Sequence, residues 1–439
     1  MKKTGTEFSD IAIIGGGAAG LMCASFSSAM NVNITVFEKN ASNKKLAADE
    51  YFDNAYLGKK LLITGKGRCN LTNACSIEDF LKNVPENPKF LFSALRSFDT
   101  NAVIDFFENN GCATKIERGN RVFPHSDKSR DVLEALKRSI NKENCRFIND
   151  EIAFVEKLSD GRFSIKSSNN SEYIFKKVII CTGGLSYPLT GSTGDGYKFA
   201  SVLGHSIKEP RGSLVPIELY GSLHEKLQGV SLKNVVLSMY DKKNKKVFTE
   251  MGEMLFTHFG ISGPLVLSCS AHIRDDINNY RIEIDLKPAL DEATLDKRII
   301  SDFTKYINRD IVNAMKDLLP QKMIEPFIEV CEIPFDLKVN SLKKEQRKVI
   351  INRLKHFPLE MQALRPVKEA VITSGGVQVS EINPSSMESK ICPGLYFAGE
   401  IIDVDAYTGG FNLQIAFSTG RLAGISAAKS IITDKGDFI

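Results

Sequence analysis

The chain has 439 residues, of which 43% are hydrophobic and 25% are charged, a composition that is typical of a soluble globular protein and excludes fibrous or largely disordered structure. A single hydrophobic core stops growing at about 250–300 residues, so we expect at least two domains. The 57 basic and 53 acidic residues leave a net charge of +4 that is spread along the chain, which argues against a large basic surface for nucleic acid.

Cysteine spacing and the N-terminal segment indicate a reducing compartment. The nine cysteines include no CxxC pair and no Cys/His cluster, so we expect neither a metal site nor a disulfide framework. The first ten residues lack the apolar stretch and cleavage site of a signal peptide, and no run approaches the roughly 20 apolar residues that cross a bilayer. We expect a cytoplasmic protein without a membrane partner, and the oligomeric state stays open.

The first third of the chain begins with a strand, a glycine turn, a helix and a second strand between Ile11 and Glu38 (IAII, GGGAAG, LMCASFSSAM, NITVFEK). A polar stretch that ends near residue 57 is predicted to be a surface insertion, and a second glycine-rich segment, LLITGKGRCNLTN, follows it. Helical periodicity predicts helices over 101–110 and 129–142, the second with Asp127 as its N-cap. Short alternating runs then predict an antiparallel meander that leads into a buried strand, VIIC.

The remainder of the chain suggests an insert within a nucleotide-binding fold. Strand-like runs dominate from about 210 to 287, with a helix-like GPLVLSCSAHI among them, and charged helices follow from 294 to 355. Short strands and glycine turns then return and end in a helix over 413–432. We predict an α/β fold in which residues 1–207 and 363–439 form one discontinuous domain. Residues 208–362 are its insert, β-rich over 208–290 and helical over 291–362.

The glycine turn carries the first chemical signal. Gly15, Gly17 and Gly20 form a GxGxxG motif at a strand-to-helix junction, where the backbone can approach a pyrophosphate and the helix N-terminus faces it. Glu38 ends the next strand, where a carboxylate accepts hydrogen bonds from ribose hydroxyls. These two features predict a dinucleotide site, but NAD and FAD share them.

The rest of the sequence favours a flavin. A β-meander replaces a further βαβ series and ends in VIICTGG. Near the C-terminus, GLYFAGEIIDVDAYTGGFNLQIAF places a second acidic-ended strand, with Glu400, before a glycine turn and a helix. Its carboxylate is suited to ribityl hydroxyls, and the helix N-terminus near residues 412–414 to anionic charge on the pyrimidine edge of reduced flavin. We therefore predict noncovalently bound FAD.

Several segments together resemble a known family: GGGAAG, KKLLITGKGRCNLTN, RVFPHSDKSRDVLEAL, VIICTGGLSYPLTGSTGDGYKFA, LFTHFGISGPLVLS, SGGV and SMESKICPGLYFAGEIIDVDAYTGGFNLQIAFSTGRLAG. The chain is similar to bacterial FAD-binding flavoproteins of the NAD(P)/FAD-dependent oxidoreductase family, which includes aminoacetone oxidase-like enzymes and bile-acid-inducible dehydro-bile-acid reductases. The resemblance spans nearly the whole chain. It implies a Rossmann-like, glutathione-reductase-like FAD-binding domain.

The resemblance also implies FAD contacts at particular positions. Contacts with the adenosine diphosphate half would come from Gly15, Gly17, Ala18, Ala19, Glu38, Lys39 and, through its backbone, Ile152. The second glycine segment would lie along the pyrophosphate and flavin through Lys60, Thr64, Gly67, Arg68, Cys69 and Asn70. The site would be completed by Thr182, Gly183, Glu400, Asp403, Gly410, Asn412 and Leu413. Two departures, a longer link over 41–57 and Lys66 in place of a usual glycine, leave the local loop shape open.

Catalytic residues are less clearly indicated. His258 is the first candidate, because a histidine beside a flavin can transfer protons near neutral pH, although a structural role is the more common one. Arg68 could orient a substrate carboxylate or serve an FAD phosphate, and a packing role is favoured for Cys69 over a redox role. Tyr187 and Tyr407 lie in glycine-rich turns that suit aromatic walls of a pocket.

Two hypotheses about function follow. The first is an FAD-dependent oxidoreductase for a small organic substrate, with the flavin reduced by substrate or NAD(P)H and reoxidised by oxygen or an unsaturated acceptor. Because only one GxGxxG precedes an acidic strand end, a nicotinamide donor would visit the flavin transiently. The second is a flavin-containing RNA-binding or RNA-modifying protein, supported only by lysines at 242–246, which we interpret as a solvated hairpin tip, and at 343–348. A pure NAD dehydrogenase is a further alternative.

Overall fold

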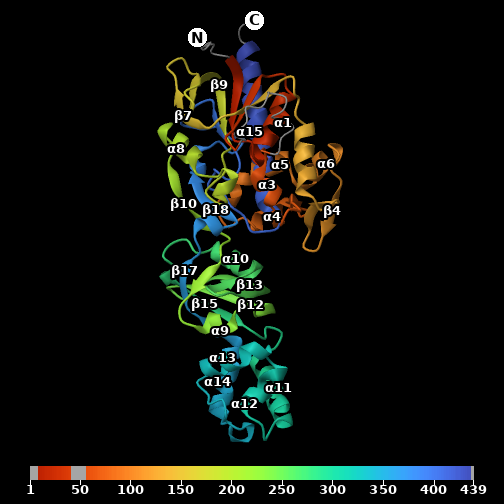
Figure 1. Cartoon of the computed structure of the whole chain (residues 1–439), viewed down its shortest axis with the longest axis vertical. Coiled ribbons are helices and arrows are strands. Elements are labelled where there is room, and N and C mark those ends of the chain that lie inside the picture. Colours follow the sequence, from red (N-terminus) through yellow and green to blue (C-terminus); the bar gives the residue numbers. More distant parts are fainter. Residues whose placement is uncertain (1–7, 41–55, 437–439) are drawn as a thin grey trace. The chain divides into compact units, whose positions relative to one another are not determined.

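The computed structural model describes residues 8–40 and 56–436 (Figure 1). The chain divides into two compact units, one formed by residues 1–212 with 367–439 and the other by residues 213–366. The first unit therefore joins two stretches that lie far apart in the sequence. Most of the predicted surface insertion, residues 41–55, lies outside the described residues.

A mostly parallel sheet forms the centre of the first unit. Its parallel strands are β6 (Cys145–Asn149), β2 (Ile34–Glu38), β1 (Phe8–Ile14), β9 (Glu172–Ile180) and β19 (Leu395–Phe397), in that spatial order. The meander strands β7 (Ile152–Lys157) and β8 (Phe163–Ser167) continue the sheet antiparallel beside the first half of β9. Because the central strands run parallel, the carboxyl ends of β1, β2, β9 and β19 meet at one edge, the usual ligand-binding edge of such sheets.

Two helices from opposite ends of the chain pack against each other on this sheet, α1 (Ala18–Ser28) and α15 (Phe411–Gly436) (Figure 1). Their contact is made by backbone rather than by large side chains. A Cβ atom on Gly420 would lie 2.6 Å from the carbonyl oxygen of Ala19, and one on Gly424 would lie 2.7 Å from that of Cys23. The close approach brings the N-terminal ends of both helices to the same edge of the sheet.

The remaining elements of the first unit surround this core and confirm the predicted α/β architecture. They are α3 (Lys59–Ile63), β3 (Thr72–Asn73), α4 (Ile77–Lys82), α5 (Phe92–Ser97), α6 (Thr100–Asn109), β4 (Thr114–Glu117), β5 (Arg121–Pro124), α7 (Ser129–Arg138), α8 (Asp195–Val202), β10 (Ile207–Ser213) and β18 (Ile372–Val377). Helices α6 and α7 confirm the predicted pair, although α7 ends four residues early. The predicted N-cap of α7 is wrong. Lys128 takes that position, because Asp127 has a φ of 59° and its carboxylate binds Arg68 and Lys115.

The second unit contains a seven-stranded antiparallel sheet and a group of helices. The strands are β11 (Ile217–Leu219), β12 (Ser231–Asp241), β13 (Lys246–Phe256), β14 (Gly260–Ser262), β15 (Tyr280–Asp285), β16 (Phe357–Leu359) and β17 (Met361–Leu364). The helices are α9 (Leu223–Leu227), α10 (Pro264–Ser270), α11 (Glu292–Lys305), α12 (Ile311–Ala314), α13 (Gln321–Val330) and α14 (Lys344–Lys355). Strands β12 and β13 form a hairpin whose lysine-rich tip is exposed, as predicted. Across residues 8–40 and 56–436, no helix is both long and apolar enough to span a bilayer.

Candidate functional site

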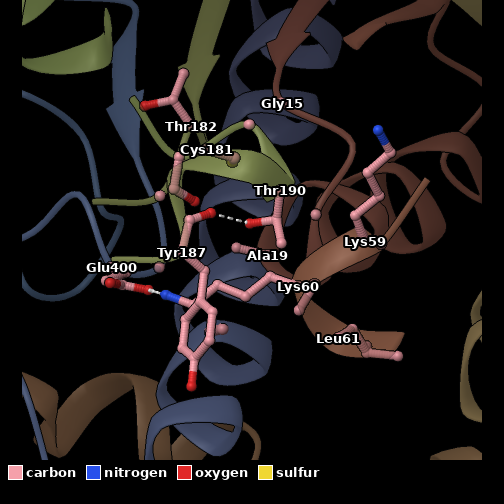
Figure 2. A pocket seen from close by; sticks show the side chains of 18 of the residues that line it. Gly15, Ala19, Lys59, Lys60, Leu61, Cys181, Thr182, Tyr187, Thr190 and Glu400 are labelled. Carbon is pink, nitrogen blue, oxygen red and sulfur yellow. Dashed lines mark hydrogen bonds and ion pairs between the residues drawn. The ribbon is translucent and has the colours of Figure 1, made fainter. Parts of the chain in front are cut away.

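A cavity of about 580 Å³ opens at the carboxyl edge of the parallel sheet in the first unit (Figure 2). Its walls come from the ends of β1, β2, β9 and β19, from the starts of α1 and α15, from α3, and from the segment 183–195 that follows β9. These pieces span nearly the whole length of the chain. The cavity is therefore a product of the fold and not of any single segment.

The first glycine turn forms one end of the cavity. Gly15 has a φ of 110°, and a Cβ atom there would lie 2.4 Å from the carbonyl oxygen of Cys181, so the turn passes directly over the end of β9. Gly17 is the N-cap of α1, no side chain caps the helix, and a Cβ on Gly17 would meet no atom within 4 Å. The free N–H groups at the start of α1 can therefore receive a phosphate from the cavity.

Glu38 holds the glycine turn from the side. Its two carboxylate oxygens accept hydrogen bonds from the backbone N–H groups of Gly16 and Asn40, each at 2.9 Å. Burial raises the pKa of Glu38 above its ordinary range, although these two donors favour the ionised form. The carboxylate also lines the cavity, where it can accept hydrogen bonds from ribose hydroxyls.

The residues after Glu38 tie the end of β2 to the segment 183–195. Lys39 forms an ion pair with Asp195 at the start of α8. The side-chain amide of Asn40 donates to the carbonyl oxygen of Thr190 at 2.5 Å. These contacts hold the segment along the wall of the cavity.

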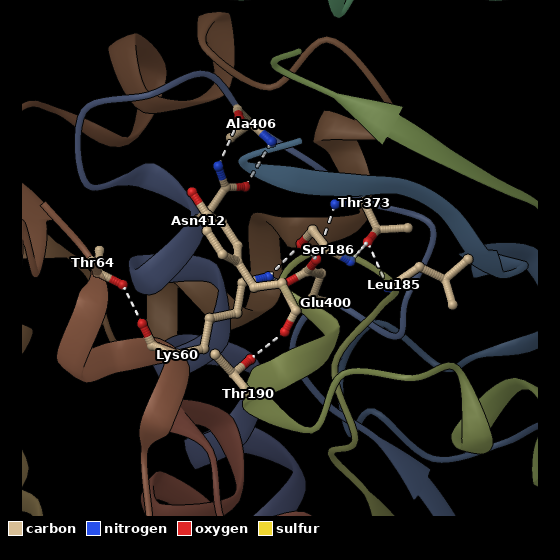
Figure 3. Close-up of polar contacts among 10 residues, drawn as sticks. Lys60, Thr64, Leu185, Ser186, Thr190, Thr373, Glu400, Ala406 and Asn412 are labelled. Carbon is tan, nitrogen blue, oxygen red and sulfur yellow. Dashed lines mark hydrogen bonds and ion pairs between the residues drawn. The ribbon is translucent and has the colours of Figure 1, made fainter. Parts of the chain in front are cut away.

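Two lining residues of opposite charge, Lys60 and Glu400, form the centre of a polar cluster (Figure 3). The Lys60 ammonium pairs with the Glu400 carboxylate and donates to the Ser186 hydroxyl at 2.6 Å. The other carboxylate oxygen of Glu400 accepts from the Ser186 hydroxyl at 2.8 Å and from the Thr373 N–H at 2.9 Å. Glu400 is thus fixed in orientation by three separate segments, with its charge balanced by one lysine.

The start of α15 also lines the cavity. The Gln414 N–H donates to the Gly410 carbonyl oxygen at 3.1 Å, so Gly410 is at the N-cap position. The Asn412 side chain accepts from the Ala406 N–H at 2.9 Å and donates to the Ala406 carbonyl oxygen at 2.6 Å, which closes the turn. Gly410 has a φ of 100°, and a Cβ atom there would lie 2.3 Å from the Thr72 carbonyl oxygen. The positive end of the helix dipole therefore faces the cavity.

Most of the residues predicted to bind the cofactor line this one cavity. They are Gly15, Gly17, Ala18, Ala19, Glu38, Lys39, Lys60, Thr64, Ile152, Thr182, Gly183, Glu400, Asn412 and Leu413. The buried Thr182 hydroxyl has no hydrogen-bond partner within residues 8–40 and 56–436, as expected of a group that binds a ligand. Six predicted residues are not among the lining residues: Gly67, Arg68, Cys69, Asn70, Asp403 and Gly410.

Arg68 and its neighbours have other partners. The Arg68 guanidinium pairs with Glu117 and Asp127 and lies over the Phe123 ring at 4.1 Å from its centroid. Hydrogen bonds to these two carboxylates raise the pKa of Arg68, so it stays charged where it is. The Cys69 side chain is buried, and burial raises the pKa of its thiol, which favours the predicted packing role over a redox role.

Asp403 lies behind the cavity. One of its carboxylate oxygens accepts from the Asn87 amide at 3.0 Å and pairs with Lys208 at 3.3 Å. His258 is exposed in the turn between β13 and β14, in the second unit, with its ring 5.0 Å from that of Phe259. Neither residue lines the cavity.

Sequence reasoning overlooked five residues of the site. Asn40, Thr190 and Asp195 line the cavity, whereas Ser186 and Thr373 lie outside its lining and orient Glu400. The signal that could have revealed Ser186, Thr190 and Asp195 is the run of glycine and hydroxyl residues, GLSYPLTGSTGDG, that begins four residues after the end of the buried strand β9. Such a run after a parallel strand indicates a ligand-binding loop.

Comparison with known proteins gives matches over nearly the whole chain. The profile of the HI0933-like protein Rossmann domain matches residues 9–426. The 3-dehydro-bile acid delta(4,6)-reductase of Clostridium scindens is 29% identical over 422 residues, which cover 95% of this chain and 99% of the relative. The ribosomal RNA dihydrouridine synthase of Escherichia coli is 30% identical over 414 residues, which cover 93% of this chain and 96% of the relative.

Similarity to solved structures is confined to the fold. The 3-ketosteroid delta1-dehydrogenase of Sterolibacterium denitrificans superposes with a TM-score of 0.50 at 11% identity, covering 97% of this chain and 100% of that one. The quinol fumarate reductase subunit FrdA of E. coli also gives a TM-score of 0.50, at 15% identity, covering 98% of this chain and 71% of that one. Both superpositions extend over nearly the whole chain.

Proposed function

This chain belongs to the HI0933-like Rossmann-domain family of FAD-dependent oxidoreductases, and from that premise we propose that it reduces a carbon–carbon double bond conjugated to a carbonyl group in a small organic molecule. The observation that carries the proposal is the convergence of the glycine turn, Glu38, Glu400 and the start of α15 on one cavity. The proposed electron donor is NAD(P)H, which would bind transiently, since the chain has one GxGxxG motif followed by an acidic strand end.

The residues of the cavity suit FAD. The free N–H groups at the start of α1 would receive the pyrophosphate, Glu38 would accept from the adenosine ribose, and Glu400 would accept from ribityl hydroxyls. The free N–H groups at the start of α15 would stabilise negative charge on the flavin ring. When bound, FAD supplies the two-electron chemistry as a hydride, and the protein supplies orientation and electrostatics.

The names of two relatives point to one kind of bond. A delta(4,6)-reductase of a 3-dehydro bile acid adds hydrogen to carbon–carbon double bonds that are conjugated to a ring ketone. A dihydrouridine synthase adds hydrogen to the carbon–carbon double bond of the uridine ring, which is conjugated to a carbonyl group. In both substrates the carbonyl withdraws electrons, so the far carbon of the double bond can accept a hydride and the near carbon a proton. This shared chemistry supports a reductase acting on a conjugated double bond.

The test is a pair of half-reactions under anaerobic conditions. The purified protein should carry FAD, and NADH or NADPH should bleach its visible absorption. A 4-ene-3-keto steroid acid or a cyclic enone should then restore the absorption and yield a product heavier by two hydrogens, whereas the matching saturated ketone should not. The proposal fails if the protein binds no FAD, or if the enone reoxidises the reduced protein no faster than the saturated ketone.

A second candidate is the reduction of uridine in ribosomal RNA, since two relatives carry that name at 29% and 30% identity. The exposed lysines at the tip of the β12–β13 hairpin supply positive charge suited to phosphates. This candidate predicts binding to unmodified ribosomal RNA that weakens steeply with salt, and conversion of uridine to dihydrouridine with NAD(P)H. Turnover of a free enone without any effect of RNA favours the small-molecule reductase instead.

A further inference from the structure

Tyr187 has an unfavourable backbone conformation at the wall of the cavity. Its φ and ψ are 53° and 58°, in the left-handed region that residues other than glycine rarely adopt, and Pro188 follows it directly. A residue before proline ordinarily adopts extended backbone. The conformation is held by Thr190, whose N–H and hydroxyl donate to the Tyr187 carbonyl oxygen at 2.8 and 2.7 Å. Strain that neighbouring groups maintain in this way is concentrated at functional sites.

Tyr187 is one of the residues that line the cavity. The ring lies beside the Lys60 ammonium, which is 5.8 Å from the ring centroid, and Tyr187 is 37% exposed. Figure 2 shows the hydroxyl pointing away from the Thr190 contact, at the end of the ring farthest from the backbone. No residue in the described part of the chain forms a hydrogen bond with this hydroxyl. The phenolic proton is therefore available to a ligand.

Most other side chains near the cavity that could donate a proton are already bound to another residue. Lys60 and the Ser186 hydroxyl both bind Glu400, and Lys39 pairs with Asp195. Burial raises the pKa of the Cys181 thiol well above its ordinary value. Lys59 and Lys66 remain, but Figure 2 shows the Lys59 side chain directed away from Tyr187 and Glu400. Among the described residues that line the cavity, the unpartnered Thr182 hydroxyl is an alcohol and too weak an acid, so Tyr187 and Lys66 are the two proton donors to compare.

We propose that the Tyr187 hydroxyl is the proton donor in the reduction, an inference that rests on the proposed function. A hydride with its electron pair, supplied by the reduced flavin, forms the new C–H bond at the carbon far from the carbonyl. The electron pair of the double bond takes the Tyr187 proton at the carbon next to the carbonyl, and the Tyr187 O–H bond breaks. The nearby Lys60 ammonium stabilises the phenolate, and water returns the proton through the exposed side of the ring.

The test compares Tyr187→Phe with wild type, with Lys66→Met as the rival donor and Tyr220→Phe, an exposed tyrosine of the second unit, as the matched control. All variants should keep the FAD content, melting temperature and rate of flavin reduction of wild type. The dissociation constant of the enone from the oxidised protein, measured without turnover from the visible difference spectrum, should change less than threefold. Reoxidation by the enone should fall about 100-fold or more in Tyr187→Phe alone, the usual contribution of a general acid.

Reoxidation of Tyr187→Phe within threefold of wild type overturns the role of Tyr187 and leaves the proposed function intact. A large loss in Lys66→Met but not in Tyr187→Phe assigns the proton to Lys66 and also overturns it. If no enone reoxidises the wild-type protein, the proposed function fails, and the role of Tyr187 fails with it.

Discussion

Replacement of Glu38 by alanine tests the adenosine end of the site. The carboxylate holds the glycine turn through Gly16 and the end of β2 through Asn40, both at 2.9 Å, and it faces the cavity. Losing a charged acceptor for ribose hydroxyls costs about 1–3 kcal/mol. The dissociation constant for FAD should therefore rise roughly 5- to 150-fold. Relaxation of the turn would add to this loss, because the N–H groups at the start of α1 would no longer be aimed at the pyrophosphate.

The assay is titration of the apoprotein with FAD, followed by the quenching of flavin fluorescence. Glu78→Gln is the matched control, because Glu78 is exposed on α4 in the same unit and does not line the cavity. A Glu38→Ala protein with a native circular dichroism spectrum and an FAD affinity within twofold of wild type would refute the reasoning. In that case Glu38 would serve the turn alone, and the ribose would lie elsewhere.

Three further predictions concern the same site. FAD affinity should fall as the pH drops through the pKa of Glu38, because protonation removes the charged acceptor. Burial raises that pKa, so the fall in affinity should begin at a higher pH than for an ordinary carboxyl group. The same titration of Glu38→Gln should show no such step. Arg68→Met should lower the melting temperature by removing the partner of Glu117 and Asp127, while calorimetric FAD affinity stays within threefold of wild type. Asn412→Ala should weaken FAD binding and make the flavin potential more negative in a redox titration, because the start of α15 loses its bonds to residue 406; an unchanged potential would exclude this role.

Local patterns in the sequence were sufficient for the elements that carry the site. The β1–turn–α1–β2 unit spans about thirty consecutive residues, and its alternation of apolar strand, glycines and helix predicts both the turn and the position of Glu38. The C-terminal glycine turn and helix were predicted for the same reason. These features depend on backbone conformation and hydrophobic periodicity, which each short segment encodes by itself.

Contacts between distant segments were beyond local patterns. Lys60 and Glu400 are 340 residues apart, and they meet because β19 pairs in parallel with β9 and thereby brings the end of β19 to the edge of the sheet beside α3. Asp127 is the opposite case, because a local pattern predicts a role for it that contacts with distant residues prevent. It precedes a helix and satisfies the local rule for an N-cap, but Arg68 and Lys115 bind its carboxylate instead.

The sequence by itself determined that this chain has a glycine turn between a strand and a helix, an acidic residue at the end of the next strand, and a C-terminal glycine turn that leads into a helix. Only the tertiary structure decided which side chains share the cavity: it paired Arg68 with Glu117, oriented Glu400 through Ser186, and left the Tyr187 hydroxyl without a partner among the described residues. The physical reason is that strand, helix and turn formation depends on neighbouring residues. Partnership between charged and polar groups depends on strand register and loop geometry, which are settled only when the whole chain packs.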